Sequence, residues 1–557
     1  MFRTFSSVLI LMTGTLSAFG AHPKVDKDLD NVNPESTVDV IIQYKQAPGA
    51  AHHKKVSDKG GQHKRDLSII KAGHYAVPAK ALAELANDPD VVAISPDREV
   101  HGMLDTAAQA INAPYSWNLG YDGTGIGIAI IDSGVDPHFD LTTSKHSKIV
   151  YSQSFVPGST STADAYGHGT HVAVVAAGSG RASACGTCTK LLSGIAPAAN
   201  IVNLRALDLN GVGTDSAVIA AIQKAVALKD TYNIRVINLS LGRPVSASYT
   251  VDPLCQAVES AWKAGIVVVV AAGNEGRNNS ASTEGYGTIT APGNDPYVIT
   301  VGAMKTMGTP SRGDDLIASY SSKGPTLLDH VVKPDLVAPG NRISAGLATN
   351  GVLTGANPQN IIPQSYFNPG ATVASVYYSM SGTSMATPMV SGAAADLLEK
   401  YPSLTPDQVK ARLMKTAYKT FPTTSQATDS VTGVTYTSQY DMFTVGAGYL
   451  DVAAALNDTN VAAGSALSPT VTLNPLTQTI SLVFSNGVIW GTGVIWGTGV
   501  IWGTNVVSSS GVIWGTGVVW GSGGNLSGTS VIWGTNIIWG TGSPVGEATA
   551  IAINGEN

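Results

Sequence analysis

Four polar residues in the central part of the chain, Asp132, His168, Asn274 and Ser384, are of the types needed for acyl transfer by an activated hydroxyl. A serine hydroxyl is a weak nucleophile at neutral pH, so it needs a base to take its proton. The imidazole of His168 can act as that base, and the carboxylate of Asp132 can orient it. The Asn274 amide and the backbone N–H of Ser384 can then stabilise the oxyanion that develops on the attacked carbonyl.

Each of these residues has a plainer interpretation when taken alone. An Asp that closes an apolar run is commonly a turn former or an N-cap, and a Ser before a helix is commonly a cap. His168 and His171 have the i, i+3 spacing of a metal-binding pair, but the His-Glu-x-x-His pattern is absent and no third ligand presents itself. The combination of acid, imidazole, amide and serine favours catalysis over these alternatives.

The elements that must position these residues are apolar runs of strand length, which alternate with helical stretches between about 105 and 457. The runs are continuous rather than alternating in polarity, which predicts an α/β fold with a mostly parallel central sheet and helices on both faces. Ligands bind such sheets outside the carboxyl ends of the strands. The predicted strands are 126–132, which ends in Asp132, 200–207, 236–242, 265–273, which precedes Asn274, and 297–303.

Four stretches, "IIDSGVD", "GHGTHVA", "AAGNEG" and "SGTSMATP", follow one another in the chain and resemble motifs of the subtilisin family of serine peptidases. The resemblance covers essentially all of 105–457. It implies that Ser384 is the nucleophile, His168 the base, Asp132 the orienting acid and Asn274 an oxyanion donor. It also implies protein or peptide substrates and no cofactor for the chemistry. Serine ester hydrolases are excluded, because they need the order Ser, Asp, His and a Gly-x-Ser-x-Gly elbow.

The resemblance also suggests a substrate pocket for the residue before the scissile bond. Thr290 stands where the pocket floor is expected, so the sequence predicts a shallow pocket that favours modest side chains. The predicted walls are Ser240, Leu241, Gly242, Ala271, Ala272 and Gly273. The stretch 349–378 is longer than in compact relatives; it could rim the cleft, but a surface insertion is favoured slightly.

The loop 178–192 departs from the family pattern. Many relatives carry a calcium-binding loop here, whereas this chain has Cys185 and Cys188. In an exported protein the two cysteines can form a disulfide; two free or metal-binding thiols are the alternative. Asp140 matches a family calcium ligand, so a structural calcium ion stays an option, and Cys255 is expected to be buried and free.

The N-terminal region has a different composition. Residues 1–20 combine Arg3, a short apolar run and small residues, which is the layout of a secretory signal. From 22 to 104 the chain has 11 Lys or Arg and 12 Asp or Glu, with strand and helix patterns typical of a small α+β module. By the resemblance, 21–104 is an inhibitory propeptide, cut near 101–105, and 105–457 is the peptidase domain.

Beyond Thr459 the chain has no Lys or Arg and only two acids, Glu547 and Glu556. We predict a linker at 458–485, a β-prone repeat of "GVIWGT" type at 486–545 and a tail at 546–557. The repeat could be a self-packing stack with a tryptophan core, or an adhesive aromatic face for polysaccharide or cell surfaces. Its tryptophans are Trp490, Trp496, Trp502, Trp514, Trp520, Trp533 and Trp539.

The totals exclude several other classes of protein. The net charge of -6 does not indicate the basic surface that nucleic-acid binding requires. Three cysteines are too few for a fold held together by disulfides. We therefore expect a secreted, monomeric serine endopeptidase that is processed from a precursor. The alternative from another class is a surface adhesin or structural repeat protein whose peptidase domain serves only self-maturation.

Overall fold

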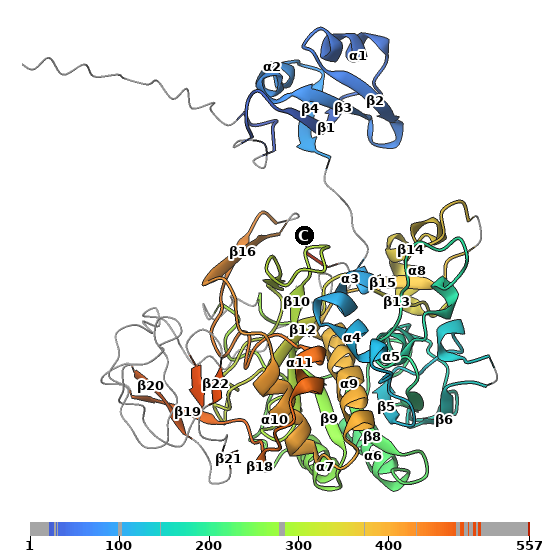
Figure 1. The fold of residues 1–557 in the computed structure, drawn as a ribbon, viewed down its shortest axis with the longest axis vertical. Coiled ribbons are helices and arrows are strands. Elements are labelled where there is room, and N and C mark those ends of the chain that lie inside the picture. The colour runs from blue at the N-terminus through green and yellow to red at the C-terminus, as the bar shows by residue number, and fades with distance from the viewer. Residues whose placement is uncertain are drawn as a thin grey trace, which may run out of the picture. The chain divides into compact units, whose positions relative to one another are not determined.

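The computed structural model describes residues 22–26, 29, 32–97, 103–144, 146–277, 284–371, 374–429, 432–474, 479–483, 488–489, 494–496, 500–502 and 555–556. The chain forms two compact units, Met1–Val100 (unit 1) and His101–Asn557 (unit 2), coloured in sequence order in Figure 1. The predicted secretory signal and most of the predicted tryptophan repeat lie outside the described residues.

Unit 1 is a four-stranded antiparallel sheet with two short helices. The strand order is β2-β3-β1-β4. Val40, Ile42 and Tyr44 alternate along β1 and are buried, so one face of the strand packs on a core of its own. The elements are β1 (Thr37–Tyr44), α1 (Ala50–Ser57), β2 (Gln62–Leu67), β3 (Ala72–Pro78), α2 (Leu82–Ala86) and β4 (Val91–Pro96).

Unit 2 is built on a sheet with the strand order β11-β10-β9-β8-β5-β7-β6, and β12 also pairs with β10. The pairings are parallel except for β10 with β11. The predicted mostly parallel α/β sheet is therefore confirmed. Its strands are β5 (Gly127–Asp132), β6 (Ile149–Ser154), β7 (Asn200–Arg205), β8 (Ile234–Leu239), β9 (Val267–Ala271), β10 (Ile299–Lys305), β11 (Leu316–Ile317) and β12 (Leu336–Pro339).

Helices cover this sheet, and every residue of β5, β9 and β10 is buried. Burial of successive residues means that both faces of these strands are covered, because side chains alternate between the faces. The longest helix, α9, runs beside β8 and β9 in the middle of unit 2 (Figure 1). The helices are α3 (Met103–Ala110), α4 (Ala113–Asn118), α5 (Gly169–Ala177), α6 (Asp215–Ala227), α7 (Pro253–Lys263), α8 (Val352–Ala356), α9 (Thr383–Lys400), α10 (Pro406–Thr416) and α11 (Val452–Asn457).

Smaller sheets complete the description of unit 2. β15 lies between β13 and β14 and leads into α9, while β16 and β17 form a hairpin. Three antiparallel pairs, β18–β21, β19–β20 and β22–β23, lie beyond α11. The bounds are β13 (Ile343–Gly346), β14 (Ile361–Ile362), β15 (Tyr377–Met380), β16 (Thr424–Thr428), β17 (Thr435–Gln439), β18 (Ala463–Gly464), β19 (Thr470–Asn474), β20 (Thr479–Val483), β21 (Val488–Ile489), β22 (Val494–Trp496) and β23 (Val500–Trp502).

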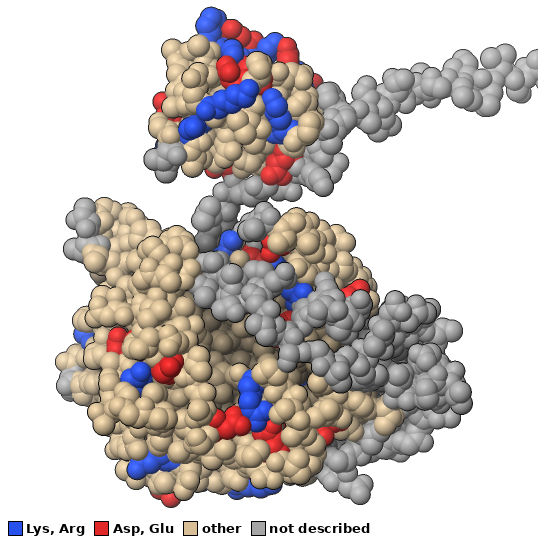
Figure 2. Space-filling view, turned by 180° about the vertical axis from the view of Figure 1, so that it is seen from behind, with Lys and Arg blue, Asp and Glu red and all other residues tan. Residues whose placement is uncertain are grey.

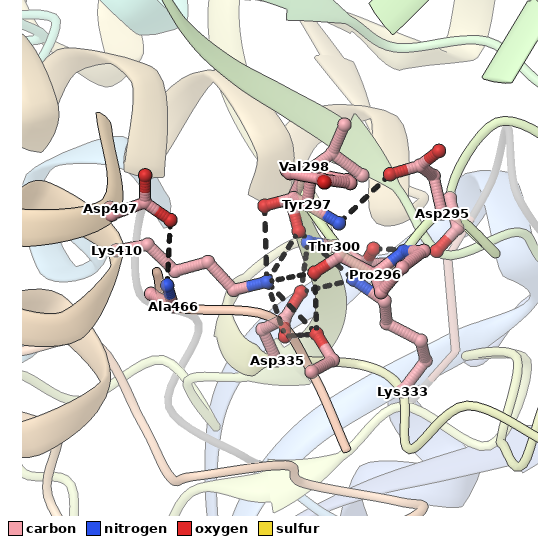
Figure 3. Close-up of polar contacts among 12 residues, drawn as sticks. Asp295, Pro296, Tyr297, Val298, Thr300, Lys333, Asp335, Asp407, Lys410 and Ala466 are labelled. Carbon is pink, nitrogen blue, oxygen red and sulfur yellow. Dashed lines mark hydrogen bonds and ion pairs between the residues drawn. The ribbon is translucent and has the colours of Figure 1, made fainter. Parts of the chain in front are cut away.

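A buried cluster around Asp335 joins distant segments of unit 2 (Figure 3). The Asp335 carboxylate lies 2.7 Å from Lys333 Nζ and 3.2 Å from Lys410 Nζ, and all three side chains are 0% exposed. The Ser468 hydroxyl donates to the same carboxylate at 2.5 Å, and Lys410 donates to the Pro296 carbonyl at 2.8 Å. The packed unit thus continues past residue 457, where we predicted the peptidase domain to end.

The structure also bears on membrane attachment. Among the residues described above, no helix has both the length and the apolar character needed to cross a bilayer.

Candidate active site

Asp132 and His168 meet where β5 ends and α5 begins. Asp132 is the last residue of β5 and its side chain is 1% exposed, whereas His168 stands directly before α5. His168 Nδ1 lies 2.8 Å from Asp132 Oδ1 and 3.0 Å from Oδ2. Because the carboxylate accepts the proton of Nδ1, Nε2 is the ring nitrogen that can take a proton from another group.

The surroundings of His168 strengthen it as a base. Burial disfavours the charged imidazolium, but the charge of Asp132 and its hydrogen bond outweigh this effect, and Asp164 adds further negative charge. The pKa of His168 is therefore raised above its usual value of 6.5.

Asp164 holds the turn that carries His168, and the sequence analysis missed it. Its carboxylate accepts hydrogen bonds from the backbone N–H groups of Gly167 and Thr170 and from the Ser133 hydroxyl, each at 2.7 Å. Burial raises the pKa of Asp164. The sequence offered no local signal for this role, because Asp164 lies four residues before His168, the N-cap residue of α5, and not at a capping position.

Ser384 is linked to the strand end that was assigned to the substrate pocket. It is the second residue of α9, and its Oγ donates to the Ser240 carbonyl at 3.3 Å. In return the Ser240 hydroxyl donates to the Ser384 carbonyl at 2.8 Å. The start of α9 is therefore fixed to the carboxyl end of β8.

Asn274 is oriented by Thr383, the residue before Ser384. Asn274 Oδ1 accepts hydrogen bonds from the Thr383 backbone N–H at 2.9 Å and from its hydroxyl at 3.0 Å. A Cβ built on Gly382 would lie 3.3 Å from Asn274 Nδ2, so the amide nitrogen faces the turn into α9. Thr383 is buried. The sequence analysis used the motif around Thr383 only to assign Ser384, so it did not reveal that Thr383 orients Asn274.

These residues lie at one edge of the sheet. Asp132 ends β5, Ser240 follows β8, and Asn274 lies just beyond β9. β5, β8 and β9 are neighbours and run parallel, so their carboxyl ends share an edge. The arrangement brings an imidazole, a carboxylate, a side-chain amide and a serine hydroxyl to one edge of the sheet.

The two predicted pocket walls come together at Thr290. A Cβ built on Gly242 would lie 2.4 Å from Thr290 Oγ1, and one on Gly273 would lie 2.9 Å from Thr290 Cγ2. The Thr290 N–H also donates to the Ala272 carbonyl at 3.1 Å. The Thr290 side chain therefore fills space beside both walls. Ser240, Ala271 and Ala272 are buried, and Leu241 is partly buried.

The long segment before Ser384 borders the turn that carries His168. The N–H of Val352 donates to the Ala165 carbonyl at 3.0 Å, and that of Leu353 donates to the Tyr166 carbonyl at 2.9 Å. The start of 349–378 thus packs on the turn before His168, and the preference for a surface insertion over a rim of the cleft stays a prediction.

Asp140, the predicted calcium ligand, contacts protein groups in this structure. It is buried, and its two carboxylate oxygens accept hydrogen bonds from the Ala182 N–H at 2.7 Å and the Tyr377 hydroxyl at 2.6 Å. A carboxylate that binds a metal can accept such hydrogen bonds as well. Calcium binding at Asp140 therefore stays a prediction.

The structure joins Cys185 and Cys188 in a disulfide bond, with their Cα atoms 4.9 Å apart. Cys255 is buried and free. One other group in the described part of the chain could hold a metal: His53, His63 and Asp66 of unit 1, whose ligand atoms lie within 4.8 Å of one another.

Comparison with known proteins places these observations in a family. The sequence model of the subtilase family matches residues 123–470. Serine protease AprX of Bacillus subtilis (strain 168) is 38% identical over 324 residues, which cover 57% of this chain and 67% of the relative. Subtilisin E of the same organism is 34% identical over 386 residues, which cover 68% of this chain and 84% of the relative. The match to a solved cold adapted subtilisin-like serine proteinase covers 60% of this chain and 90% of that protein, at 27% identity and a TM-score of 0.40. The family match and the two sequence relatives together show that the chain belongs to the subtilase family.

Proposed function

We propose that the protein is a serine endopeptidase that hydrolyses peptide bonds through an acyl-enzyme on Ser384. The observation that carries this proposal is the 2.8 Å contact between His168 Nδ1 and Asp132, at the sheet edge where Asn274 and Ser384 also lie. AprX is named a serine protease, and membership of the same family supports this activity.

In the proposed reaction His168 Nε2 takes the proton of the Ser384 hydroxyl as Oγ attacks the substrate carbonyl. The Asn274 Nδ2 group and the Ser384 N–H donate to the oxyanion, while Asp132 stabilises the imidazolium. The imidazolium then gives its proton to the leaving amine, and the acyl-enzyme remains. Water, deprotonated by His168, hydrolyses the ester and restores Ser384.

The pocket residues support a preference for modest side chains before the scissile bond, because Thr290 fills space between Gly242 and Gly273. Replacing Thr290 with Gly should enlarge the pocket. We expect Thr290→Gly to raise kcat/KM for a phenylalanine substrate about tenfold relative to an alanine substrate, since one methylene more or less in an apolar pocket is worth about 1–3 kcal/mol. If the wild type already prefers large aromatic residues, the shallow pocket is excluded.

We also propose that unit 1 is an inhibitory propeptide and that residues 1–20 direct secretion. The separate core of unit 1 supports an independent module. A monomeric state and the absence of a nucleic-acid partner stay predictions. The adhesin alternative depends on the repeat at 486–545, most of which lies outside the described residues, so we do not propose it.

The test compares the full chain with its Ser384→Ala variant. We expect a serine-directed fluorophosphonate to label the wild type at Ser384 alone, and only the wild type to cleave a peptide and to lose residues up to about 100, as followed by intact mass. Peptide cleavage by Ser384→Ala, or labelling of another serine, would contradict the proposed nucleophile. Retention of unit 1 by a labelled wild type would contradict the propeptide role alone.

A further inference from the structure

Glu556 is an unusual residue for its part of the chain. Residues 459–557 contain two charged residues, Glu547 and Glu556, yet Glu556 is buried in unit 2 and only 8% exposed. Burying a carboxylate is unfavourable unless it is paired and hydrogen-bonded. A specific site must therefore compensate the charge of Glu556.

The contacts of Glu556 form such a site. Its carboxylate accepts hydrogen bonds from the Ser319 N–H at 2.8 Å and from the Ser319 hydroxyl. It lies 2.5 Å from Arg277 Nη2 and 3.3 Å from Lys305 Nζ. Asn341 pairs with the main chain: its amide donates to the Glu556 carbonyl at 2.9 Å, and its Oδ1 accepts from the Glu556 N–H at 3.0 Å.

Arg277 is held for this role by residues of unit 2. Its Nε donates to the Ser319 hydroxyl at 2.6 Å, its Nη1 lies 2.7 Å from Asp429, and its guanidinium stacks 4.8 Å from the centre of the Tyr436 ring. The Arg277 side chain is 5% exposed. Arg277 is thus held in place by contacts other than those to Glu556.

One side of this site continues into the turn before Ser384. Asn341 follows Gly340, whose carbonyl accepts a hydrogen bond from the Gly382 N–H at 2.8 Å. The N–H of Arg342 donates to the Ser381 hydroxyl at 2.8 Å. A Cβ built on Gly555 would lie 2.5 Å from the same Ser381 hydroxyl, so Gly555 packs directly on this turn.

The other side continues into the segment that carries Asn274. Arg277 stands three residues after Asn274, and the N–H of Gly276 donates to the Tyr320 carbonyl at 2.8 Å, next to Ser319. Glu556 therefore contacts one segment that leads to the oxyanion donor and another that leads to the nucleophile.

We propose that unit 2 contains a binding site for a peptide carboxylate, that Gly555–Glu556 occupies it, and that this occupancy positions the turns carrying Asn274 and Ser384. Glu556 is a positioning residue, and the ligand class is an acidic side chain preceded by glycine. The activity part of the proposal rests on the proposed function.

The same contacts bear on the predicted repeat at 486–545. On its N-terminal side the chain is anchored to unit 2, where the Pro469 carbonyl accepts a hydrogen bond from the Val332 N–H at 2.8 Å. On its C-terminal side it is anchored by Glu556. A single cut within the repeat should therefore leave the fragment that contains Glu556 bound to the enzyme.

The kinetic test uses the full chain with Glu556→Gln, which removes the charge at nearly constant size, and Glu547→Gln as the matched control. We expect Glu556→Gln to lower kcat and the rate of fluorophosphonate labelling at Ser384 by about tenfold or more, because a charged hydrogen-bond network is lost, with KM little changed and native circular dichroism. Glu556→Asp should recover part of the loss, and Glu547→Gln should match the wild type. A kcat within about twofold of the wild type, or a loss explained by the unfolded fraction, would overturn the positioning role.

A binding test does not depend on catalysis. In the Ser384→Ala, Glu556→Ala full chain, a fluorescent peptide with the sequence of residues 551–557 should bind saturably. The same peptide with the Glu556→Gln substitution should bind at least about tenfold more weakly, since a buried ion pair is lost. Equal binding of the two peptides would overturn the carboxylate site. If the wild type is catalytically inactive but the peptides differ as expected, the proposed function fails and the site stands.

Discussion

The two units keep their charged residues in different places. In Figure 2 blue and red atoms crowd the surface of unit 1, whereas the larger unit is mostly tan with scattered charges. The Lys54–Asp58 pair of unit 1 is 74% and 55% exposed, but the Lys333–Asp335 pair of unit 2 is 0% exposed on both sides. Exposed ion pairs contribute about 0–1 kcal/mol to stability, whereas breaking a buried one costs about 3–5 kcal/mol.

This difference indicates two uses of the same residue types. In unit 1 such pairs lie on the surface, and the small core consists of apolar residues of that unit. In unit 2 the buried pairs join segments that are far apart in the sequence: Lys410 meets Asp335, and Arg277 meets Glu556 across 279 positions. We therefore expect the buried charges of unit 2 to favour one arrangement of distant segments, because any other arrangement leaves a charge without its partner.

The largest effect is expected from Asp335→Asn, which removes the carboxylate between Lys333 and Lys410. The two buried ammonium groups would then lie close together without their common partner, and unit 2 should lose about 3–5 kcal/mol of unfolding free energy. The matched control is Asp58→Asn in unit 1, expected to cost less than about 1 kcal/mol. Urea denaturation in a Ser384→Ala background, with hydrogen exchange resolved by unit, measures both. Equal losses would remove the contrast between the units.

A smaller effect is expected from Thr383→Val. This variant tests whether an uncharged buried hydrogen bond also positions Asn274. The variant removes the hydroxyl that donates to Asn274 Oδ1 and accepts from the Gly273 N–H at 3.2 Å, but it keeps the backbone N–H that donates to Asn274 Oδ1. One hydrogen bond contributes about 1 kcal/mol, so kcat should fall about fivefold to tenfold with KM nearly constant. Thr387→Val, one turn further along α9, serves as the control for loss of a buried hydroxyl. If both variants lower kcat equally, the orientation of Asn274 is not the cause.

The histidines of the two units provide a comparison by pH. In unit 1 burial and the neighbouring His63 lower the pKa of His53, whereas in unit 2 Asp132 outweighs burial and raises that of His168. Only neutral His168 can act as a base, so kcat/KM should fall as the pH drops through a value above 6.5. Asp164→Asn removes a negative charge near His168 and should move this acid limb to lower pH. Asp230→Asn, which removes an exposed carboxylate of unit 2 that is not among the charges acting on His168, should leave the limb where it is.

Much of unit 2 could be predicted from sequence because its signals are local. Continuous apolar runs such as 265–273 indicated buried parallel strands, and Asp132 and Asn274 were recognised because each follows such a run. Asp164 and Thr383 were missed because their role depends on a turn that brings their polar atoms to another residue. The site of Glu556 could not be predicted at all, since no local pattern connects residues 279 positions apart.

The smallest effect is expected from the exposed pair on α1. Lys54 Nζ lies 2.9 Å from Asp58 Oδ1 at the i, i+4 spacing, and such pairs have coupling energies of about 0.3–0.5 kcal/mol. A double-mutant cycle with Lys54→Met and Asp58→Asn, read from hydrogen exchange of the unit 1 amides, should give this value at about 0.1 M salt. At about 1 M salt the coupling should approach zero, because the screening length falls to about 3 Å. A coupling above about 2 kcal/mol, or one that salt leaves unchanged, exceeds what an exposed pair can contribute. The surface charges of unit 1 would then hold its fold together, as the buried charges do in unit 2.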